Sequence, residues 1–432
     1  MNNNQVKNKK IVTPAKNPLL GVIEIPSDKS ISHRAAIFSS LAQGKSKIIN
    51  FSSGKDCHST LNVLQNLGVE VDFLSNKDLI LKAPKSFERP NCILDAGNSG
   101  TTIRLMSGIL ARQNFSCCIT GDDSLRKRPM ARVIKPLELM GANISSLHNC
   151  APLSFEGAVL QGIDYKSPIA SAQVKSCIML AGLGACGATT ISEPFLSRNH
   201  TELMLEYLGA DIQTDGSKVT INPSSLEPKT IEIAGDISSA AFFIGAALLI
   251  EGSDIILKNV GLNPTRTGVL DVFKRMGASI EILDKRTKSG EKLGDLRIKY
   301  SNLTGTTIEG SDIPRLIDEI PLIAVIATQA TGKTIIKDAE DLRNKESDRI
   351  VAIANELLKM NIEIEQTPDG MIIEGRQKLL GNAIIETYHD HRIAMSMYIA
   401  GLLADSPIQI NEFEWVDISF PEFEFLMDKL KN

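Results

Sequence analysis

The sequence has few aromatic residues, no excess of positive charge and no long hydrophobic run. Aromatic side chains make up 5% of the 432 residues, so a surface on which nucleic-acid bases stack is not expected. The net charge is −4, and any anion-binding site must therefore be a local concentration of cations. The longest apolar run, residues 240–250, is too short to span a bilayer, so no membrane association is expected.

Cysteine is scarce as well. The seven cysteines are odd in number, scattered, and without C-x-x-C spacing, which is typical of reduced thiols in a cytoplasmic protein. Residues 1–10 are polar and basic without an apolar core, so neither a signal peptide nor an anchor is expected there. With 43% hydrophobic and 23% charged residues, the composition is that of an ordinary globular protein, for which we expect a cytoplasmic location.

One pattern occurs six times along the chain. An apolar helix ends at glycine or a small polar residue, and a β-branched strand follows it. The copies are residues 34–51, 102–120, 176–192, 238–257, 321–336 and 392–410. After most of them, a second, amphipathic helix closes on a glycine and leads to another strand. Six units in 432 residues leave about 72 residues for each, which is too long for a solenoid repeat.

The first helix of each unit is apolar on nearly all sides, as in residues 240–247. Such a helix must be buried, so we predict domains with helices inside and sheets outside. The length of the chain exceeds that of a single core, and mixed α/β units of this size favour two domains of three units each. A boundary is expected near residues 233–236.

Polar and cationic residues gather at the starts of these helices. The clusters are residues 28–34, 98–104, 125–130, 171–176, 198–202, 318–321 and 345–349, and Arg392. Taken singly, each has the composition of a helix cap or a solvated loop. Because helix N-termini favour anions, the clusters together predict a deep cleft for a ligand with several negative groups. Asp318 and Glu346 are out of place among cations unless they move protons.

Three familiar motifs are better explained without a cofactor or metal. Residues 182–187 match G-x-G-x-x-G, but they follow a helix and precede a strand, the reverse of a dinucleotide fingerprint. Residues 327–334 resemble a phosphate loop, but they too lie between helix and strand. His389 and His391 have no third ligand at a suitable spacing.

Four motifs in this order resemble those of the 5-enolpyruvylshikimate-3-phosphate synthases, the 3-phosphoshikimate 1-carboxyvinyltransferases. They are DKSISHR at 28–34, GNSGT at 97–101, KRPM at 127–130 and KESDR at 345–349. The runs at 171–175, 198–202 and 263–266 look like the class II branch. The resemblance covers nearly the whole chain. It implies two inside-out domains of three βαβαββ repeats each, made of 28–234 and of 1–27 with 235–432, with the active site in the cleft between them.

The reaction implied by this resemblance transfers the enolpyruvyl group of phosphoenolpyruvate to the 5-hydroxyl of shikimate 3-phosphate and releases phosphate. It belongs to chorismate and aromatic amino acid biosynthesis and needs no metal or other cofactor. The hydroxyl attacks C2 while C3 is protonated, and the tetrahedral intermediate then loses phosphate. Asp318 is the implied base for the hydroxyl and Glu346 the implied acid for the methylene carbon, with Lys29 in support.

The resemblance also implies the binding residues. Those for shikimate 3-phosphate are Lys29, Ser30, Arg34, Ser171, Ala172, Gln173, Arg198, Asp318 and Lys345. Those for phosphoenolpyruvate are Lys29, Gly100, Arg128, Gln173, Arg349 and Arg392.

The chain departs from the family pattern in two places. Ser27 stands where class II members usually have glycine, which affects a turn more than the chemistry. The lysine that many class I members carry near the C-terminus is absent at residues 418–421, so phosphoenolpyruvate would depend on Arg349 and Arg392. Gly100, where some glyphosate-tolerant members have alanine, leaves room for that inhibitor, and we expect a glyphosate-sensitive protein.

Three alternatives remain open. The UDP-N-acetylglucosamine enolpyruvyl transferases are similar in fold and chemistry, but they typically place a catalytic cysteine in the loop at residues 122–129, where this chain has none. RNA-terminal phosphate cyclases use related repeats, although the acidic net charge and few aromatics argue against an RNA partner. A binding protein without activity would have no need of Asp318 and Glu346. We expect a monomer with small-molecule substrates and no nucleic-acid partner.

Overall fold

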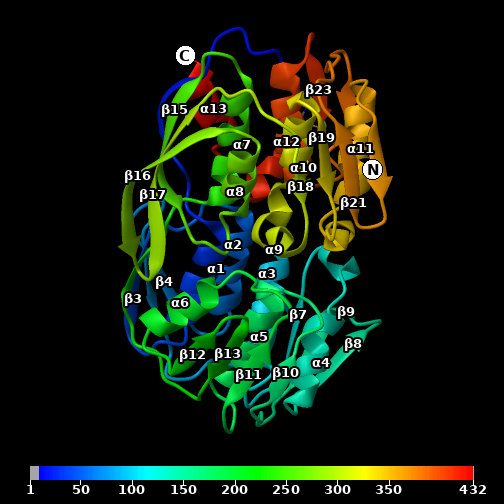
Figure 1. The fold of residues 1–432 in the computed structure, drawn as a ribbon. Helices are drawn as coiled ribbons and strands as arrows, with labels where there is room; N and C mark the ends of the chain where they lie inside the picture. The colour runs from blue at the N-terminus through cyan, green and yellow to red at the C-terminus, as the bar shows by residue number, and fades with distance from the viewer. Residues whose placement is uncertain (1–8, 432) are drawn as a thin grey trace, which may run out of the picture. The chain divides into compact units, whose positions relative to one another are not determined.

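The structure, a computed structural model, describes residues 9–431. The chain divides into two compact units, each with its own hydrophobic core (Figure 1). Unit 2 consists of residues 27–234 and 287–292, and unit 1 of residues 9–26, 235–286 and 293–431. The expectation that residues 1–10 contain neither a signal peptide nor an anchor concerns mainly residues 1–8, which lie outside the described residues. Within residues 9–431, each helix is too short or too polar to cross a membrane.

Unit 2 contains three repeats of similar element order. The first has α1 (Lys29–Ser39), β3 (Lys45–Ile49), α2 (Lys55–Gln65), β4 (Glu70–Phe73) and β5 (Leu79–Lys82). The second has β6 (Leu94–Asp95), α3 (Gly100–Leu110), β7 (Cys117–Thr120), η1 (Leu125–Lys127), α4 (Ala131–Leu139), β8 (Asn143–Leu147) and β9 (Cys150–Glu156). The third has β10 (Asp164–Lys166), α5 (Ala172–Gly182), β11 (Thr189–Ser192), α6 (His200–Tyr207), β12 (Ile212–Asp215) and β13 (Lys218–Ile221), and β14 (Thr230–Glu232) ends the unit.

Unit 1 contains the other three repeats. The fourth has β2 (Leu20–Glu24), α7 (Ile237–Leu249), β15 (Asp254–Gly261), α8 (Gly268–Arg275), β16 (Ser279–Lys288) and β17 (Glu291–Lys299). The fifth has β18 (Thr307–Ile308), η2 (Gly310–Asp312), α9 (Ile313–Leu316), η3 (Ile317–Glu319), α10 (Ile320–Gln329), β19 (Lys333–Ile336), η4 (Glu340–Asn344), α11 (Arg349–Lys359), β20 (Ile364–Thr367) and β21 (Gly370–Glu374). The sixth has β22 (Ile384–Ile385), α12 (His391–Leu403), β23 (Ile408–Asn411), η5 (Phe413–Ile418) and α13 (Phe423–Lys431), with β1 (Lys9–Val12) from the start of the chain.

The sheets repeat one pairing scheme. In the order β6-β7-β9-β8, the first pair is parallel and the other two are antiparallel, and the sheets β10-β11-β13-β12 and β18-β19-β21-β20 follow the same rule. The sixth repeat differs. Among the described residues, it lacks the antiparallel hairpin that ends the other repeats, such as β8–β9, and β1 pairs antiparallel with β23 instead.

The chain passes from one unit to the other after β2 and again after β14. β2 pairs in parallel with β15 of unit 1, although α1 of unit 2 follows it in the sequence. β14 likewise pairs in parallel with β3 of unit 2 before the chain continues into α7 of unit 1. In addition, the tip of the β16–β17 hairpin, residues 287–292, groups with unit 2. No local pattern in the sequence marks this tip, because its grouping with unit 2 depends on residues distant in the chain.

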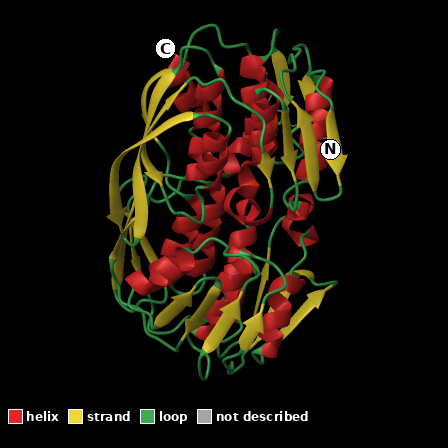
Figure 2. Ribbon diagram, viewed as in Figure 1, coloured by secondary structure: helices red, strands yellow, loops and turns green. Residues whose placement is uncertain are grey.

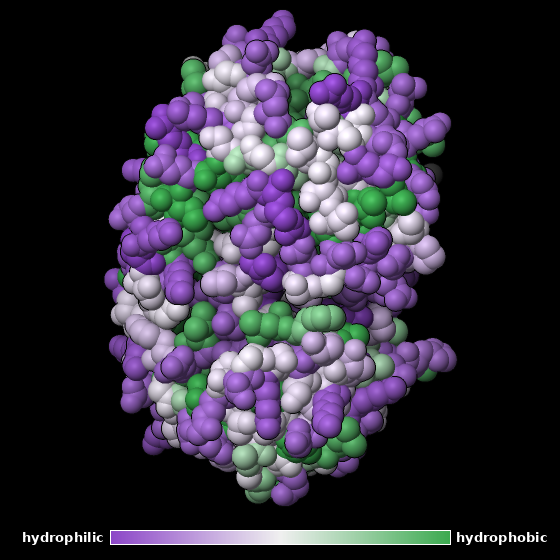
Figure 3. All heavy atoms as spheres, viewed as in Figure 1, coloured by the Kyte–Doolittle hydropathy of each residue, from purple (hydrophilic) through white to green (hydrophobic). Residues whose placement is uncertain are grey.

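The first helix of each repeat is buried, as its apolar composition predicts. In α12 the residues from His391 to Leu402 are all buried, and in α10 those from Ile320 to Thr328. Figure 2 shows the helices in the interior of each unit and the strands at its periphery. Hydrophilic side chains predominate on the face drawn in Figure 3, where hydrophobic ones form small groups. The prediction of helices inside and sheets outside is therefore confirmed.

Glycines end the second helices and permit close helix packing. Gly68 and Gly141, which follow α2 and α4, have φ values of +90° and +95°, the left-handed conformation that glycine adopts at low cost. At Gly108 in α3, an added Cβ would lie 2.1 Å from the carbonyl oxygen of Cys177 in α5. The glycine-rich run at 182–187 lies between α5 and β11, so it lacks the strand-then-helix order of a dinucleotide site.

Phe423 lies in the aromatic core of unit 1 and provides a test of the packing. It is fully buried, and its ring lies 5.1–6.4 Å from those of Phe242, Phe243, Tyr398, Phe413 and Phe420. We predict that Phe423→Ala lowers the free energy of unfolding by about 3–5 kcal/mol, because the cavity cannot close. Phe425→Ala on the same helix, where the side chain is 62% exposed, should change it by about 0.5 kcal/mol or less.

Urea unfolding followed by the fluorescence of Trp415 measures both variants. Trp415 is the single tryptophan of the chain and lies in η5 of unit 1. Equal stability losses in the two variants would contradict the assigned packing.

Candidate active site

The predicted residues of unit 2 lie at the starts of three buried helices and in two loops. We call this set the unit 2 cluster; it consists of Lys29, Ser30, Arg34, Gly100, Arg128, Ser171, Ala172, Gln173 and Arg198. Helices α3 and α5 run in the same direction, because Thr101 bonds to Gln173 near their starts and Gly108 meets Cys177 further along. Their N-terminal N–H groups, and the partial positive charge that they carry, therefore lie at the same end.

Asp28 and Asp56 organise the start of α1. The Asp28 carboxylate accepts a hydrogen bond from the Ile31 N–H at 2.8 Å, which caps the helix. Lys29 is the first helical residue, and its Nζ donates to Asp56 Oδ2 at 3.2 Å. Asp56 was not among the predicted residues.

Arg34 is buried beneath the start of α1 and joins three elements. Its guanidinium donates to the Ser30 carbonyl at 3.0 Å, to Thr201 Oγ1 at 2.7 Å and to Ser176 Oγ at 2.9 Å. Burial lowers the pKa of Arg34 to about 10, which still leaves it protonated at neutral pH. The charge of Arg198 also lowers this pKa, so the two arginines form a local positive region suited to an anion.

Gly100 lies among cationic side chains at the start of α3. A Cβ at this position would lie 3.2 Å from Arg104 Nη1 and 3.3 Å from Arg128 Nη1. Arg128 is oriented by Asn98, whose side-chain oxygen accepts from its Nη2 at 2.8 Å. Arg104 donates to Gln173 Oε1 at 2.6 Å, which places it with the predicted residues although it was not one of them.

A chain of hydrogen bonds connects α1, α2 and α3. His33 Nδ1 bonds to Thr60 Oγ1 at 2.7 Å, Thr60 to Thr102 at 2.7 Å, and Thr102 donates to the N-cap Ser99 at 2.7 Å. Burial, together with the charges of Lys29 and Arg34, holds the pKa of His33 well below its usual range. His33 is therefore a neutral structural group at physiological pH.

Arg349 is the centre of the predicted residues in unit 1. It is 2% exposed, and its guanidinium donates to Asp390 at 2.8 Å, to Asp318 Oδ1 at 3.2 Å and to Glu346 Oε2 at 2.6 Å. Burial opposes the charge of Arg349, but Asp390, Glu346 and Asp318 outweigh that effect and raise its pKa. We call Asp318, Glu346, Arg349 and Arg392 the unit 1 cluster.

The carboxylates around Arg349 differ in their access to solvent. Asp390 is fully buried, and it also caps α12 by accepting from the Arg392 N–H at 2.8 Å. The side chains of Asp318 and Glu346 are 20% and 21% exposed, so they can reach a bound molecule. Asp390 therefore supports Arg349 from the protein interior, whereas Asp318 and Glu346 contact it from the partly exposed side.

A second buried network adjoins Arg392. Ser238 donates to Glu319 and accepts from Arg266, which also contacts Asp236 at 3.3 Å. Arg392 Nη1 donates to the Ser238 carbonyl at 3.4 Å and lies 3.7 Å from Glu319 Oε1. Arg266 Nη1 is 3.9 Å from Asp318 Oδ2, which links this network to the unit 1 cluster.

Lys345 is oriented differently from its neighbours in the sequence. Its Nζ forms an ion pair with Asp341 at 3.0 Å, and its side chain is 23% exposed. Lys345 thus contacts η4 rather than Arg349, although the two lie in one motif.

Several residues that support the clusters are not among the site residues predicted from the sequence, although some of them lie in the polar runs named above. They are Asp56, Asn98, Arg104 and Glu193 in unit 2, and Asp236, Ser238, Arg266, Glu319 and Asp390 in unit 1. One signal was available: Asp28, Asp236 and Asp390 each cap the first helix of a repeat, so the repeated position marks them as equivalent. Within residues 9–431, no group of three or more His, Cys, Asp or Glu side chains is arranged to hold a metal ion.

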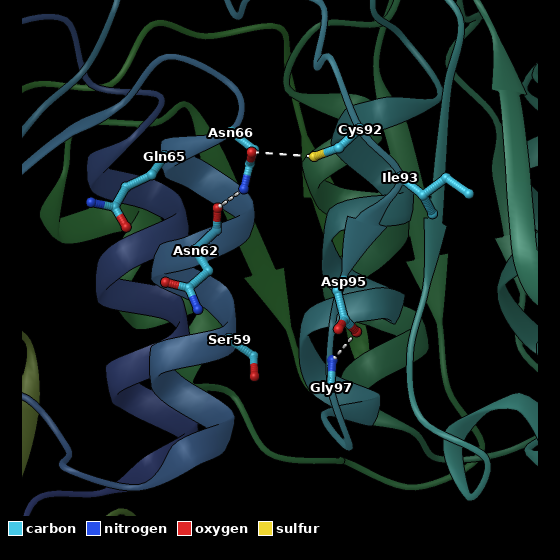
Figure 4. A pocket seen from close by; sticks show the side chains of 8 residues that line it. All are labelled: Ser59, Asn62, Gln65, Asn66, Cys92, Ile93, Asp95 and Gly97. Carbon is cyan, nitrogen blue, oxygen red and sulfur yellow. Dashed lines mark hydrogen bonds between the residues drawn. The ribbon is translucent and has the colours of Figure 1, made fainter.

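A polar pocket of about 460 Å³ adjoins the unit 2 cluster without containing its cations (Figure 4). On α2 it is lined by Ser59, Asn62, Gln65 and Asn66, which carry no charge. Cys92, Ile93, Asp95 and Gly97 line the other side, and the Asp95 carboxylate accepts from the Gly97 N–H at 2.8 Å. The pocket thus meets the backbone that precedes Gly100.

Comparison with known proteins places the chain in a family. The family model described as EPSP synthase (3-phosphoshikimate 1-carboxyvinyltransferase) matches residues 13–427. The 3-phosphoshikimate 1-carboxyvinyltransferase of Petrotoga mobilis is 51% identical over 428 residues, 98% of this chain and 99% of its own. That of Thermoanaerobacter sp. strain X514 is 52% identical over 414 residues, 95% of this chain and 98% of its own.

A solved structure agrees with these relatives. EPSP synthase from Acinetobacter baumannii superimposes with a TM-score of 0.87 and 41% identity, covering 98% of both chains. The family resemblance and the fold class predicted from the sequence motifs are therefore confirmed. The chain belongs to the EPSP synthase family, the 3-phosphoshikimate 1-carboxyvinyltransferases.

Proposed function

We propose that this protein transfers the enolpyruvyl group of phosphoenolpyruvate to the 5-hydroxyl of shikimate 3-phosphate and releases phosphate. The observation that carries the proposal is the arrangement around Arg349, where a buried cation contacts two partly exposed carboxylates, Asp318 and Glu346. Such a group can bind an anionic substrate and exchange protons with it. Membership of the family favours this acceptor over UDP-N-acetylglucosamine and over RNA.

The reaction proceeds by addition and elimination. In the addition, Asp318 accepts the proton of the 5-hydroxyl, and the hydroxyl oxygen bonds to C2 of phosphoenolpyruvate. Glu346 donates a proton to C3. In the elimination, the bond between C2 and the phosphate oxygen breaks, phosphate leaves, and the methyl group returns a proton to the Glu346 carboxylate, which regenerates the double bond. Lys29 and the arginines stabilise the negative charge on the departing phosphate.

The unit 2 cluster supplies most of the binding groups in this proposal. Lys29, Ser30, Arg34, Ser171, Ala172, Gln173 and Arg198, with Asp318 and Lys345 of unit 1, hold shikimate 3-phosphate. Lys29, Gly100, Arg128, Gln173, Arg349 and Arg392 hold phosphoenolpyruvate. Since the proton-transfer groups and most cations belong to different units, we propose that one pair of substrates contacts both clusters and that the domains are those expected from the sequence.

We further propose a cytoplasmic monomer that acts on small molecules without a cofactor or a nucleic-acid partner. The free state of the seven cysteines, all of which lie within the described residues, supports the cytoplasmic location.

Phosphate release by the purified protein tests the function directly. With phosphoenolpyruvate present, we expect release with shikimate 3-phosphate and none with UDP-N-acetylglucosamine. Release with the nucleotide sugar alone would overturn the acceptor, and release with neither would overturn the activity.

Asp318→Asn tests the assigned base. We predict that turnover falls at least about a hundredfold while binding of shikimate 3-phosphate remains, because the amide can still accept from Arg349 but cannot take a proton. Glu374→Gln, at an exposed carboxylate of β21 in the same unit, is the matched control and should keep the wild-type rate. Stopped-assay phosphate release gives the rates, and calorimetric titration gives the affinity. Unchanged turnover in Asp318→Asn would remove Asp318 from this role.

Glyphosate tests the environment of Gly100. We predict that millimolar glyphosate inhibits the wild-type protein, since no side chain at position 100 competes with the inhibitor. Gly100→Ala places a methyl group within 3.3 Å of the Arg104 and Arg128 guanidinium groups. This should weaken inhibition about tenfold or more, the factor that about 1.4 kcal/mol represents.

Inhibition curves at fixed phosphoenolpyruvate measure this effect. Ser107→Ala, a similarly small change further along α3, is the control and should leave the sensitivity as it is. A wild-type rate that does not change at millimolar glyphosate would refute the prediction.

A further inference from the structure

Lys175 is a buried cation that has no role in the reaction proposed above. It lies on α5 and is 1% exposed. Its Nζ is 2.9 Å from Glu193 Oε2 and 2.7 Å from Glu202 Oε1, and it also donates to the Ser197 carbonyl at 3.5 Å. Glu193 follows β11, and Glu202 lies in the first turn of α6. One ammonium group thus connects three segments of unit 2.

Such a network is not needed for stability alone. Removing three charged groups from water is costly, and well-packed apolar side chains of similar volume are often as stable or more so. The two carboxylates exceed the lysine by one negative charge. Burial lowers the pKa of the neighbouring Arg34, and the charge of Glu202 is the largest of the effects that raise it again. Glu202 therefore helps to keep Arg34 charged.

Glu193 has a different task, because its oxygens hold backbone groups. Oε1 accepts from the Ser171 N–H at 2.8 Å. Oε2 accepts from the Ser197 N–H at 3.3 Å and from the Ser197 hydroxyl at 2.8 Å. With the carbonyl bound by Lys175, all three polar groups of Ser197 are engaged. The next residue in the chain is Arg198.

We propose that Glu193, itself held by Lys175, is a positioning residue for shikimate 3-phosphate. It fixes the start of α5 at Ser171 and the segment that carries Arg198, two groups assigned above to that substrate. Because Glu193 is only 6% exposed and its oxygens are engaged with protein groups, it acts through these neighbours rather than by contact with the substrate. The inference rests on the proposed function. It adds the reason why the start of α5 and the segment that carries Arg198, which are distant in the sequence, keep a fixed geometry.

Glu193→Gln tests the inference with nearly unchanged volume. The amide retains one acceptor oxygen, and its NH₂ group faces either the Ser171 N–H or the donors of Lys175 and Ser197, so one of the two segments loses its hydrogen bonds to residue 193. We expect the KM for shikimate 3-phosphate to rise about tenfold or more, while kcat and the KM for phosphoenolpyruvate stay within about threefold. Calorimetric titration with shikimate 3-phosphate alone should show the same loss of affinity.

Two further variants separate positioning from general stability. Ser197→Ala removes one hydrogen bond to Glu193 and leaves the charges in place, so it should raise the same KM by a smaller factor without a risk to folding. Ile191→Val, at a buried apolar residue of β11 two positions before Glu193, is the matched control. It should lower the melting temperature and leave both KM values unchanged.

The outcomes are distinct. Raised KM for shikimate 3-phosphate in both Glu193→Gln and Ser197→Ala supports the inference. The inference is wrong if the wild type is active but Glu193→Gln has an unchanged KM for shikimate 3-phosphate, or if its KM values for both substrates rise equally. Either result leaves the proposed function intact. A wild type that releases no phosphate overturns the proposed function and this inference with it.

Discussion

Keeping buried cations charged is the constraint on which both clusters depend. Arg349 is almost fully buried and keeps its charge because three carboxylates contact it, and Lys175 lies between two more. Burial costs each cation several kcal/mol of solvation, and the contacting carboxylates offset that loss. A region rich in arginine therefore needs buried carboxylates such as Asp390 beside the partly exposed ones, Asp318 and Glu346. This explains why carboxylates occur among the buried cations of both units.

The fold decides where these charges can lie. A helix that is apolar on all sides, such as α7, exposes no side-chain face, so only its ends remain available for function. The N-terminal end has unpaired N–H groups and a partial positive charge, both suited to phosphate and carboxylate. Caps at Asp28 and Asp390 satisfy some of these groups, and a cation lies one or two residues after each cap, at Lys29 and Arg392. The repeated architecture thus produces a repeated position for binding residues.

Sequence reasoning succeeded where the signal is local. The six buried helices, the glycines that end the second helices, and the cations at helix starts all follow from short patterns. Long-range partners were missed, because Asp390 and Arg349 are 41 residues apart, and Ser238 and Glu319 are 81 apart, with no periodicity to link them. Lys345 shows the limit of proximity in sequence, since it adjoins Glu346 yet pairs with Asp341. The predicted roles of the site residues remain predictions.

We propose that the residues at and just before the helix starts bind the two anionic substrates. The most direct measurement is a diffraction structure of the protein crystallised with shikimate 3-phosphate and phosphoenolpyruvate. We expect shikimate 3-phosphate within hydrogen-bond distance of Ser171 and Arg198, and phosphoenolpyruvate within hydrogen-bond distance of Arg128 and Arg349. Electron density for both ligands away from these helix starts would contradict this proposal.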